Sequence, residues 1–163
     1  MAITLDAAST LSLTIVRVMK LFHGTRQHAP RYHPGLDAGA YPVLFNLATG
    51  PKRVSELAEC VHSDISTVSR QASTLVALGI AKKVTDPSDG RAQVITITDE
   101  GESLVELIKD ERSHWLQAML ADWSPEDVAG FTAYLDRFGK ALEASRARAM
   151  TQGSTTPTTH QEN

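Results

Sequence analysis

Six side chains within one short stretch have the chemistry of nucleic-acid contacts. They are hydroxyl groups around a single guanidinium, in the order Ser63, Ser66, Thr67, Ser69, Arg70 and Ser73. Hydroxyl residues are poor helix formers, so helix stability does not account for them. Short donors and acceptors near a helix N-terminus suit phosphate oxygens and base edges in a DNA major groove. The stretch predicts a DNA-contacting helix, although Arg70 has the alternative of an outward salt bridge to Glu56 or Glu59.

A second charged group follows in a Pro- and Gly-containing segment. Arg91 is of the type that enters the DNA minor groove, whose negative potential attracts arginine. Asp89, two residues earlier, is expected to hold the Arg91 guanidinium by a charge-assisted hydrogen bond rather than to touch DNA. The alternative is a surface ion pair of little energetic value. Asp86 is expected to fix the turn.

These side chains need two helices and a hairpin to position them. The spacing of apolar residues predicts a helix from Val54 to Val61, and Ser63 or Asp64 is a candidate N-cap for the next one. That second helix ends at a glycine stop, Leu78-Gly79. Its expected buried face is Ile65, Val68, Ala72, Leu75 and Val76.

Two strands follow the second helix. Residues 81–86 and 92–98 have strand composition, and the segment 86–91, DPSDGR, is expected to be the hairpin loop between them. Two helices followed by a hairpin constitute a winged helix-turn-helix. The predicted fold class is therefore mainly α with a small β-hairpin wing (α+β).

The sequence resembles the MarR family of bacterial transcriptional regulators. The resemblance rests on the helix string STVSR (66–70), on the spacing from Leu75 to Gly79, and on the wing DPSDGRAQVITITDEG (86–101). The wing is close to the family pattern D-x-x-D-x-R…(Leu/Ile)-Thr-x-x-Gly, with Ile97 where leucine is usual. The resemblance implies double-stranded DNA as a partner and a homodimer whose terminal helices interlock.

In MarR-like proteins, small aromatic ligands often bind between the dimer helices and the DNA-binding lobe. By resemblance, the expected lining of such an effector pocket is His23, Tyr41, Phe45 and Trp115. The alternative is that these four side chains belong to the core. Some family members sense oxidants through cysteine, but there the cysteine lies in the first helix, so Cys60 is expected to be a small buried core residue.

Amphipathic segments flank the predicted winged domain. Helices are expected over 9–28, 37–48, 99–120 and 125–147, and the first and last carry apolar stripes that one small domain does not cover. A symmetric dimer is the common solution, and it would space two recognition helices by roughly 34 Å on a near-palindromic site. We divide the chain into N-terminal dimerisation helices (1–49), DNA-binding core (50–98), C-terminal dimerisation helices (99–148) and a disordered tail (149–163).

Composition and charge limit which other classes of protein the sequence can represent. The chain has 163 residues and a formal net charge of −3, but residues 50–98 carry a slight basic excess while the acidity lies after residue 99. Charge alone therefore supports DNA binding weakly. A signal peptide and an apolar run of the ~20 residues that span a bilayer are both missing, which predicts a cytoplasmic protein without a membrane partner.

Enzyme and metal functions find little support. The sequence has no Gly-rich phosphate loop, H-E-x-x-H or G-x-S-x-G motif, so no catalytic residue and no cofactor are expected. The spacing of five between His23, His28 and His33 is not that of a helical ligand pair, and we expect no metal site there.

The sequence thus predicts a sequence-specific transcriptional repressor that binds palindromic operator DNA as a homodimer and is released by a small-molecule effector. The alternative is a winged-helix protein–protein module that has lost DNA binding. The operator, the regulated genes, the effector and the choice between repressor and activator stay open.

Overall fold

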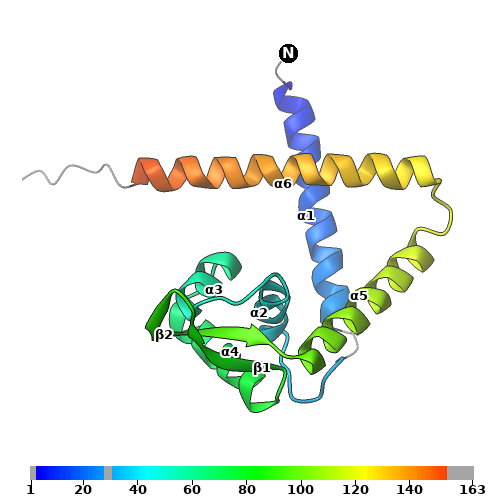
Figure 1. Cartoon of the computed structure of the whole chain (residues 1–163). Coiled ribbons are helices and arrows are strands. Elements are labelled where there is room, and N and C mark those ends of the chain that lie inside the picture. The colour runs from blue at the N-terminus through cyan, green and yellow to red at the C-terminus, as the bar shows by residue number, and fades with distance from the viewer. Residues whose placement is uncertain (1–2, 28–30, 154–163) are drawn as a thin grey trace, which may run out of the picture. The chain divides into compact units, whose positions relative to one another are not determined.

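The computed structural model of the chain describes residues 3–27 and 31–153 (Figure 1). Their elements, in order, are α1 (Leu5–Gln27), α2 (Ala40–Leu47), α3 (Val54–Val61), α4 (Ile65–Ala77), β1 (Ala81–Asp86), β2 (Asp89–Ile97), α5 (Asp99–Met119) and α6 (Pro125–Gly153). The two strands form one antiparallel hairpin. The predicted fold class, mainly helical with a β-hairpin wing, is confirmed.

Several predicted boundaries shift for local reasons. Helix α2 begins later than predicted because the Asp37 carboxylate accepts hydrogen bonds from the backbone N–H groups of Gly39 (2.9 Å) and Ala40 (3.0 Å). Helix α6 starts as predicted, where the Ser124 hydroxyl accepts a hydrogen bond from the Asp127 N–H at 3.1 Å. It continues to Gly153, into the predicted tail. Residues 154–163, the rest of that tail, lie outside the described residues.

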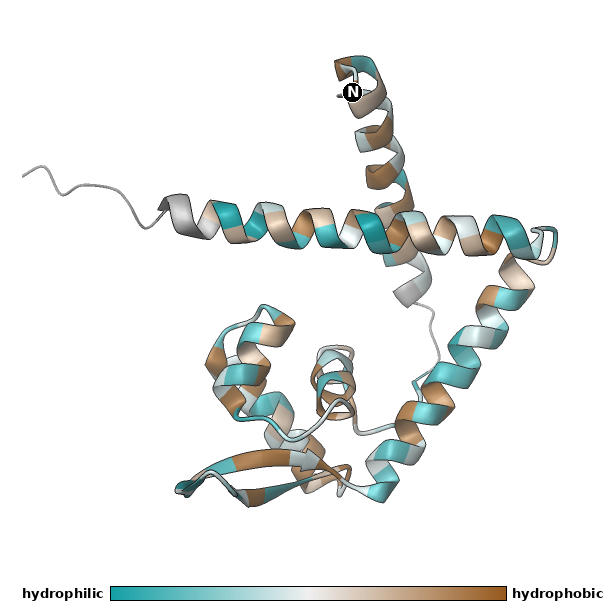
Figure 2. Ribbon diagram, turned by 45° about the horizontal axis from the view of Figure 1, so that its top comes forward, coloured by the Kyte–Doolittle hydropathy of each residue, from teal (hydrophilic) through white to brown (hydrophobic). Residues whose placement is uncertain are grey.

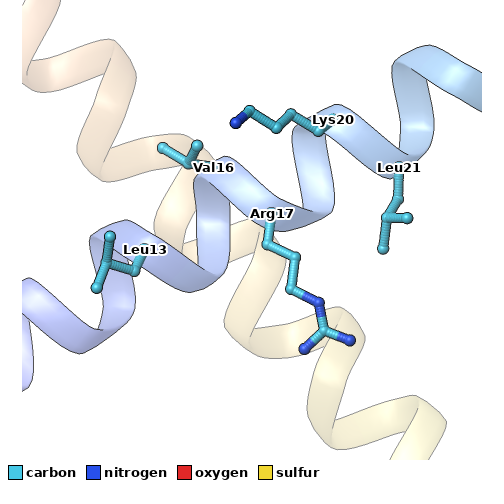
Figure 3. A pocket seen from close by; sticks show the side chains of 5 residues that line it. All are labelled: Leu13, Val16, Arg17, Lys20 and Leu21. Atoms are coloured by element: carbon cyan, nitrogen blue, oxygen red, sulfur yellow. The ribbon is translucent and has the colours of Figure 1, made fainter.

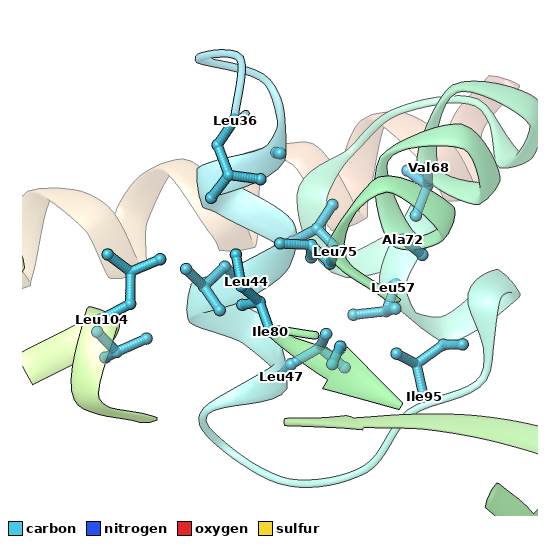
Figure 4. Close-up of a cluster of buried hydrophobic side chains, with 14 of the residues drawn as sticks. Leu36, Leu44, Leu47, Leu57, Val68, Ala72, Leu75, Ile80, Ile95 and Leu104 are labelled. Carbon is cyan, nitrogen blue, oxygen red and sulfur yellow. The ribbon is translucent and has the colours of Figure 1, made fainter. Parts of the chain in front are cut away.

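One hydrophobic core holds the winged lobe together (Figure 4). Helices α2, α3 and α4, the base of the hairpin and the first half of α5 all contribute to it, and its largest fully buried side chains include Leu44, Leu57, Leu75 and Ile108. Helix α4 enters this core through Val68, Ala72 and Leu75.

Ile65 was predicted to belong to the buried face of α4, and this prediction is wrong. Its side chain is 59% exposed, whereas Val68, one turn further along, is fully buried. The helical period places Ile65 toward the core side of the helix, but full burial along α4 begins only at Val68.

The hairpin is tighter than predicted. Asp86 pairs directly with Asp89, so only Pro87 and Ser88 form the turn, and β2 already contains Gly90 and Arg91. The register slips between the pair Thr85–Gln93 and the pair Asp86–Asp89. Such an irregularity bends a strand and re-aims its side chains. Arg91 lies within it and is exposed.

The recognition helix, the wing and α5 meet at Ile80. The Ile80 N–H donates to the Leu75 carbonyl at 3.0 Å, beside Gly79 at a φ of +76°, which completes a glycine-type helix end. The Ile80 carbonyl accepts from the N–H (3.1 Å) and the hydroxyl (2.9 Å) of Thr98, the residue before α5. Gly101, in the first turn of α5, packs directly against this carbonyl.

Apolar residues recur along the long helices α1, α5 and α6 (Figure 2), and many of their side chains are exposed. The chain divides after Arg112 into two compact units. Helix α1 belongs to the first unit, and the end of α5 belongs to the second unit together with α6. On α1 the exposed apolar residues include Leu11, Val18, Met19 and Phe22, and on α6 they include Phe131, Leu135, Phe138 and Leu142. Both helices therefore present apolar faces that this chain's own described residues leave accessible.

We expect Gly101→Ala to lower the free energy of unfolding by about 1–3 kcal/mol, the usual cost of overpacking. A Cβ at Gly101 would lie 2.2 Å from the Ile80 carbonyl oxygen, which belongs to the backbone and has no rotamer to change. Urea denaturation followed by circular dichroism, at one fixed protein concentration, measures the effect.

Gly130→Ala is the matched control, since a Cβ there meets no heavy atom within 4 Å. In a helix interior this substitution should stabilise by about 0.4–1 kcal/mol. Equal effects of the two substitutions would contradict a tight junction at Ile80.

Candidate nucleic-acid interface

The turn between α3 and α4 fixes the start of the recognition helix. His62 adopts the left-handed conformation with a φ of 55°, and Asp64 is the N-cap of α4. The Asp64 carboxylate accepts hydrogen bonds from the Ser66 hydroxyl (2.5 Å) and the Thr67 N–H (2.8 Å). These hydrogen bonds, led by that from Ser66, lower the pKa of the Asp64 carboxyl well below its usual value. Asp64 rather than Ser63 is thus the cap, and Ser63 lies exposed in the turn.

Four of the predicted contact residues form one exposed stripe on α4. Their spacing of three and four residues places them on the same helix face, and all four are exposed: Ser66, Ser69, Arg70 and Ser73. Thr67 lies off this stripe and is half-buried. The Ser73 hydroxyl donates to the Ser69 carbonyl at 2.8 Å, which leaves its lone pairs outward.

Arg70 does not form the salt bridge that was its alternative. Within the described part of the chain its guanidinium has no ion pair, and Glu56 instead accepts a hydrogen bond from the Arg53 N–H at 2.7 Å. The exposed guanidinium is therefore available to an external acceptor.

Arg53 links the start of α3 to the wing, a role the sequence analysis missed. Its Nε and Nη2 donate to one oxygen of Asp86 at 2.9 and 2.6 Å, and the other Asp86 oxygen accepts from the Ser88 N–H at 2.8 Å. The Ser88 N–H first, and then the Arg53 guanidinium, lower the pKa of the Asp86 carboxyl below its usual value. Asp86 is buried. It fixes the hairpin turn, as predicted, and also ties the turn to α3.

Asp89 has a different partner from the one predicted. Its Oδ2 lies 3.5 Å from Nη2 of Arg53, and its Oδ1 accepts a hydrogen bond from the Arg91 backbone N–H at 3.2 Å. The expected ion pair with the Arg91 guanidinium is not formed in the described structure. Asp89 therefore shapes the backbone at Arg91 and leaves that side chain free at the wing tip.

Two of the four residues predicted for an effector pocket lie on the same helix. Tyr41 and Phe45 lie one turn apart on α2, and Arg112 stacks over the Phe45 ring at 4.6 Å. The Tyr41 hydroxyl is buried and has no hydrogen-bond partner among the described residues. His23 lies on α1, and Trp115 lies on α5 beyond Arg112.

Two shallow hollows are lined by other residues. One lies along α1, where Leu13, Val16 and Leu21 alternate with Arg17 and Lys20 (Figure 3). The other is lined by Asp122, Trp123 and Asp127. None of the predicted pocket residues lines either hollow.

Cys60 and the histidine series are the remaining candidates for reactive or metal-binding side chains. Cys60 was predicted to be buried, but it is exposed, because the buried face of α3 runs through Leu57 and Ala58. In the described residues no group of three or more His, Cys, Asp or Glu side chains is placed to hold a metal ion. His28, the middle member of the predicted histidine series, lies outside them.

The fold and this surface define a winged helix-turn-helix protein, a DNA-binding class in which a recognition helix is followed by a hairpin wing. A family model described as MarR family matches residues 35–92. The HTH-type transcriptional regulator YxaD of Bacillus subtilis (strain 168) is 40% identical over 108 residues, 66% of this chain and 76% of that protein. The chain belongs to the MarR family of transcriptional regulators, which confirms the resemblance.

Solved structures agree with this assignment. A MarR family protein from Bacillus stearothermophilus matches with a TM-score of 0.76 over 87% of this chain and 99% of that chain, at 17% identity, and so shares the fold. The PcaV transcriptional regulator from Streptomyces coelicolor, solved in complex with its natural ligand, matches with a TM-score of 0.55 over 87% and 99%, at 25% identity. None of the described helices is long and apolar enough to cross a membrane.

We expect Asp86→Asn to weaken the attachment of the wing and to flatten the acid dependence of stability. Because the folded-state pKa of Asp86 is lowered, its contribution is complete above the ordinary carboxyl pKa and is lost as pH falls through the folded value. The wild-type unfolding free energy should therefore fall more steeply below about pH 5 than that of the variant. Urea denaturation across pH measures this, and amide exchange at Ser88 should be faster in the variant.

Asp136→Asn is the control, since its partner Lys140 is an exposed i, i+4 neighbour on α6. Exposed pairs of this kind contribute little. If the unfolding free energy fell with equal slope at acid pH in wild type and in Asp86→Asn, a stabilising role for the Asp86 carboxylate would be contradicted.

Proposed function

We propose that this chain is a cytoplasmic, homodimeric transcriptional regulator that represses by binding a near-palindromic operator. The exposed stripe of α4 would enter the major groove of each half-site, and the wing would reach the adjacent minor groove. One observation carries the proposal: Arg70 and Arg91, one on each of these two elements, are exposed and have no ion pair in the described structure. Both guanidinium groups are thus available to DNA.

The apolar surfaces of α1 and α6 support a dimer. Leu13 is 70% exposed on α1, and Leu135 is 52% exposed on α6. Monomeric soluble proteins rarely expose large contiguous apolar patches, and a two-fold axis buries the same face of both subunits at once. A dimer also doubles the number of DNA contacts, which a chain of net charge −3 needs.

An effector that releases DNA is supported by two observations. The buried Tyr41 hydroxyl has no partner among the described residues, and a buried polar group without a hydrogen bond costs free energy. The similar regulator PcaV was solved with its natural ligand. A small aromatic compound with one polar group would suit the surroundings of Tyr41 and Phe45. Such a compound would release DNA only if it bound the DNA-binding conformation of the protein and a second, non-binding conformation with different affinities.

The proposal predicts specific, salt-dependent binding of the duplex upstream of the chain's own gene. Fluorescence anisotropy with unrelated duplex as competitor measures the affinity across a salt series. Arg70→Ala should weaken specific binding by about 1–3 kcal/mol if Arg70 reads a base. Arg91→Ala should weaken binding while the oligomeric state stays unchanged.

Lys140→Ala serves as the control, because it removes the same charge from α6, which carries none of the proposed DNA contacts, in a surface pair of little value. Weak binding that is equal for specific and unrelated duplexes would favour a protein–protein module instead, provided that a wider set of genomic duplexes gives the same result. Unchanged affinity of Arg91→Ala would remove the wing tip from the mechanism.

The dimer is tested by placing a charge on the apolar face of α6. We expect Leu135→Asp to shift sedimentation-velocity profiles from dimer toward monomer, since an unpaired buried charge is costly. Ala133→Asp is the control because position 133 lies on the opposite side of α6 and is exposed. Dimers of equal stability in both variants would exclude this face from the interface.

A further inference from the structure

One large apolar side chain stands apart on the winged lobe. In the described stretch 31–106, Ile65 alone among the large hydrophobic residues is exposed, at 59%. It is the first residue of α4, directly after the Asp64 cap. Every other exposed large hydrophobic residue of the described chain lies on or beside α1, α5 or α6.

Neither the local structure nor the core accounts for an isoleucine at this position. It is β-branched and a weaker helix former than Leu, Ala or Glu. The first turn of a helix favours proline or an acidic side chain, and isoleucine is neither. The core contact of α4 begins at Val68, which is fully buried. An external apolar contact explains the residue better than the fold does.

The neighbours of Ile65 place it on the DNA-facing end of the recognition helix. Ser69, one turn further along, belongs to the exposed stripe, and the turn before Ile65 is held by the hydrogen bonds of Asp64 to Ser66 and Thr67. In helix-turn-helix proteins the N-terminal residues of the second helix contact base edges in the major groove. The only apolar group on those edges is the C5-methyl of thymine.

We propose that Ile65 is a specificity-determining residue that packs against the 5-methyl group of thymine in each half-site of the operator. This inference rests on the proposed function as a DNA-binding regulator and adds the chemical group that is recognised. The hydroxyls and Arg70 of the stripe contact polar base edges and phosphates, whereas Ile65 distinguishes thymine from cytosine and from unmethylated uracil by an apolar contact.

The test removes the methyl group from the DNA. In the operator duplex defined by footprinting, each thymine of a half-site is replaced in turn by deoxyuridine, which lacks only that methyl. Affinities are measured by anisotropy with the full chain, for wild type, Ile65→Ala and Ile65→Val. Melting curves check that each variant is folded, and deoxyuridine outside the footprint is the control duplex.

We expect at least one thymine at which deoxyuridine weakens wild-type binding by about three- to fivefold, the value of one buried methyl group. Ile65→Ala should bind the thymine duplex more weakly and should not distinguish it from the deoxyuridine duplex. Ile65→Val, which keeps the branched methyl groups, should retain the discrimination.

Two outcomes overturn the inference while leaving the regulator intact. One is specific wild-type binding that no deoxyuridine substitution weakens. The other is a deoxyuridine effect that persists undiminished in Ile65→Ala, because another side chain then contacts the methyl. If wild type binds no duplex specifically, the proposed function itself fails and this inference fails with it.

Discussion

The hydrogen bonds at the Ile80 carbonyl join the three parts of the molecule that have to move together. Helix α4 ends just before Ile80, where the Ile80 N–H donates to the Leu75 carbonyl, and β1 begins just after it. Thr98 donates hydrogen bonds to the Ile80 carbonyl, and Gly101 in the first turn of α5 packs against the same carbonyl. No Cβ fits between Gly101 and this oxygen. Packed interiors rearrange between discrete states rather than deforming continuously. A displacement of the start of α5 therefore has to move the wing and α4 as well, and the proposed effector would act through this connection.

The sequence predicted those features that depend on neighbouring residues. The apolar spacing from Val54 to Val61, the glycine stop at Gly79 and the Ser124 cap each act within one or two helical turns, and the structure places them as expected. The stripe containing Arg70 was predictable for the same reason, since residues three and four apart share a helix face. The family resemblance then added what periodicity alone does not contain, namely the assignment of this lobe to DNA.

Features that depend on distant residues were not predictable from the sequence. Helical periodicity gives the angle of Ile65 around its helix axis, but not how far the core extends along that axis. The same limit applies to Cys60, which lies beside the buried face of α3 and is exposed. The pair Arg53–Asp86 joins residues 33 positions apart, and the local sequence instead suggested Asp89 with Arg91. An arginine directly before α3 and an acid at the turn were visible, but only the fold brings them together.

The pairing of Arg53 determines which cations of the winged lobe remain available to DNA. Arg53 is held by two acids, Asp86 and Asp89, so this pairing takes up one cation and two carboxylates of residues 50–98. Phosphate contacts by Lys and Arg provide the salt-dependent, sequence-independent part of affinity. In the described structure the other cations of this segment form no ion pair and can supply that part of the affinity: Lys52, Arg70, Lys82, Lys83 and Arg91. In the proposed dimer, base-edge contacts of α4 and the binding of two half-sites at once would supply discrimination between sequences, and the apolar contact proposed for Ile65 would add to it without adding charge.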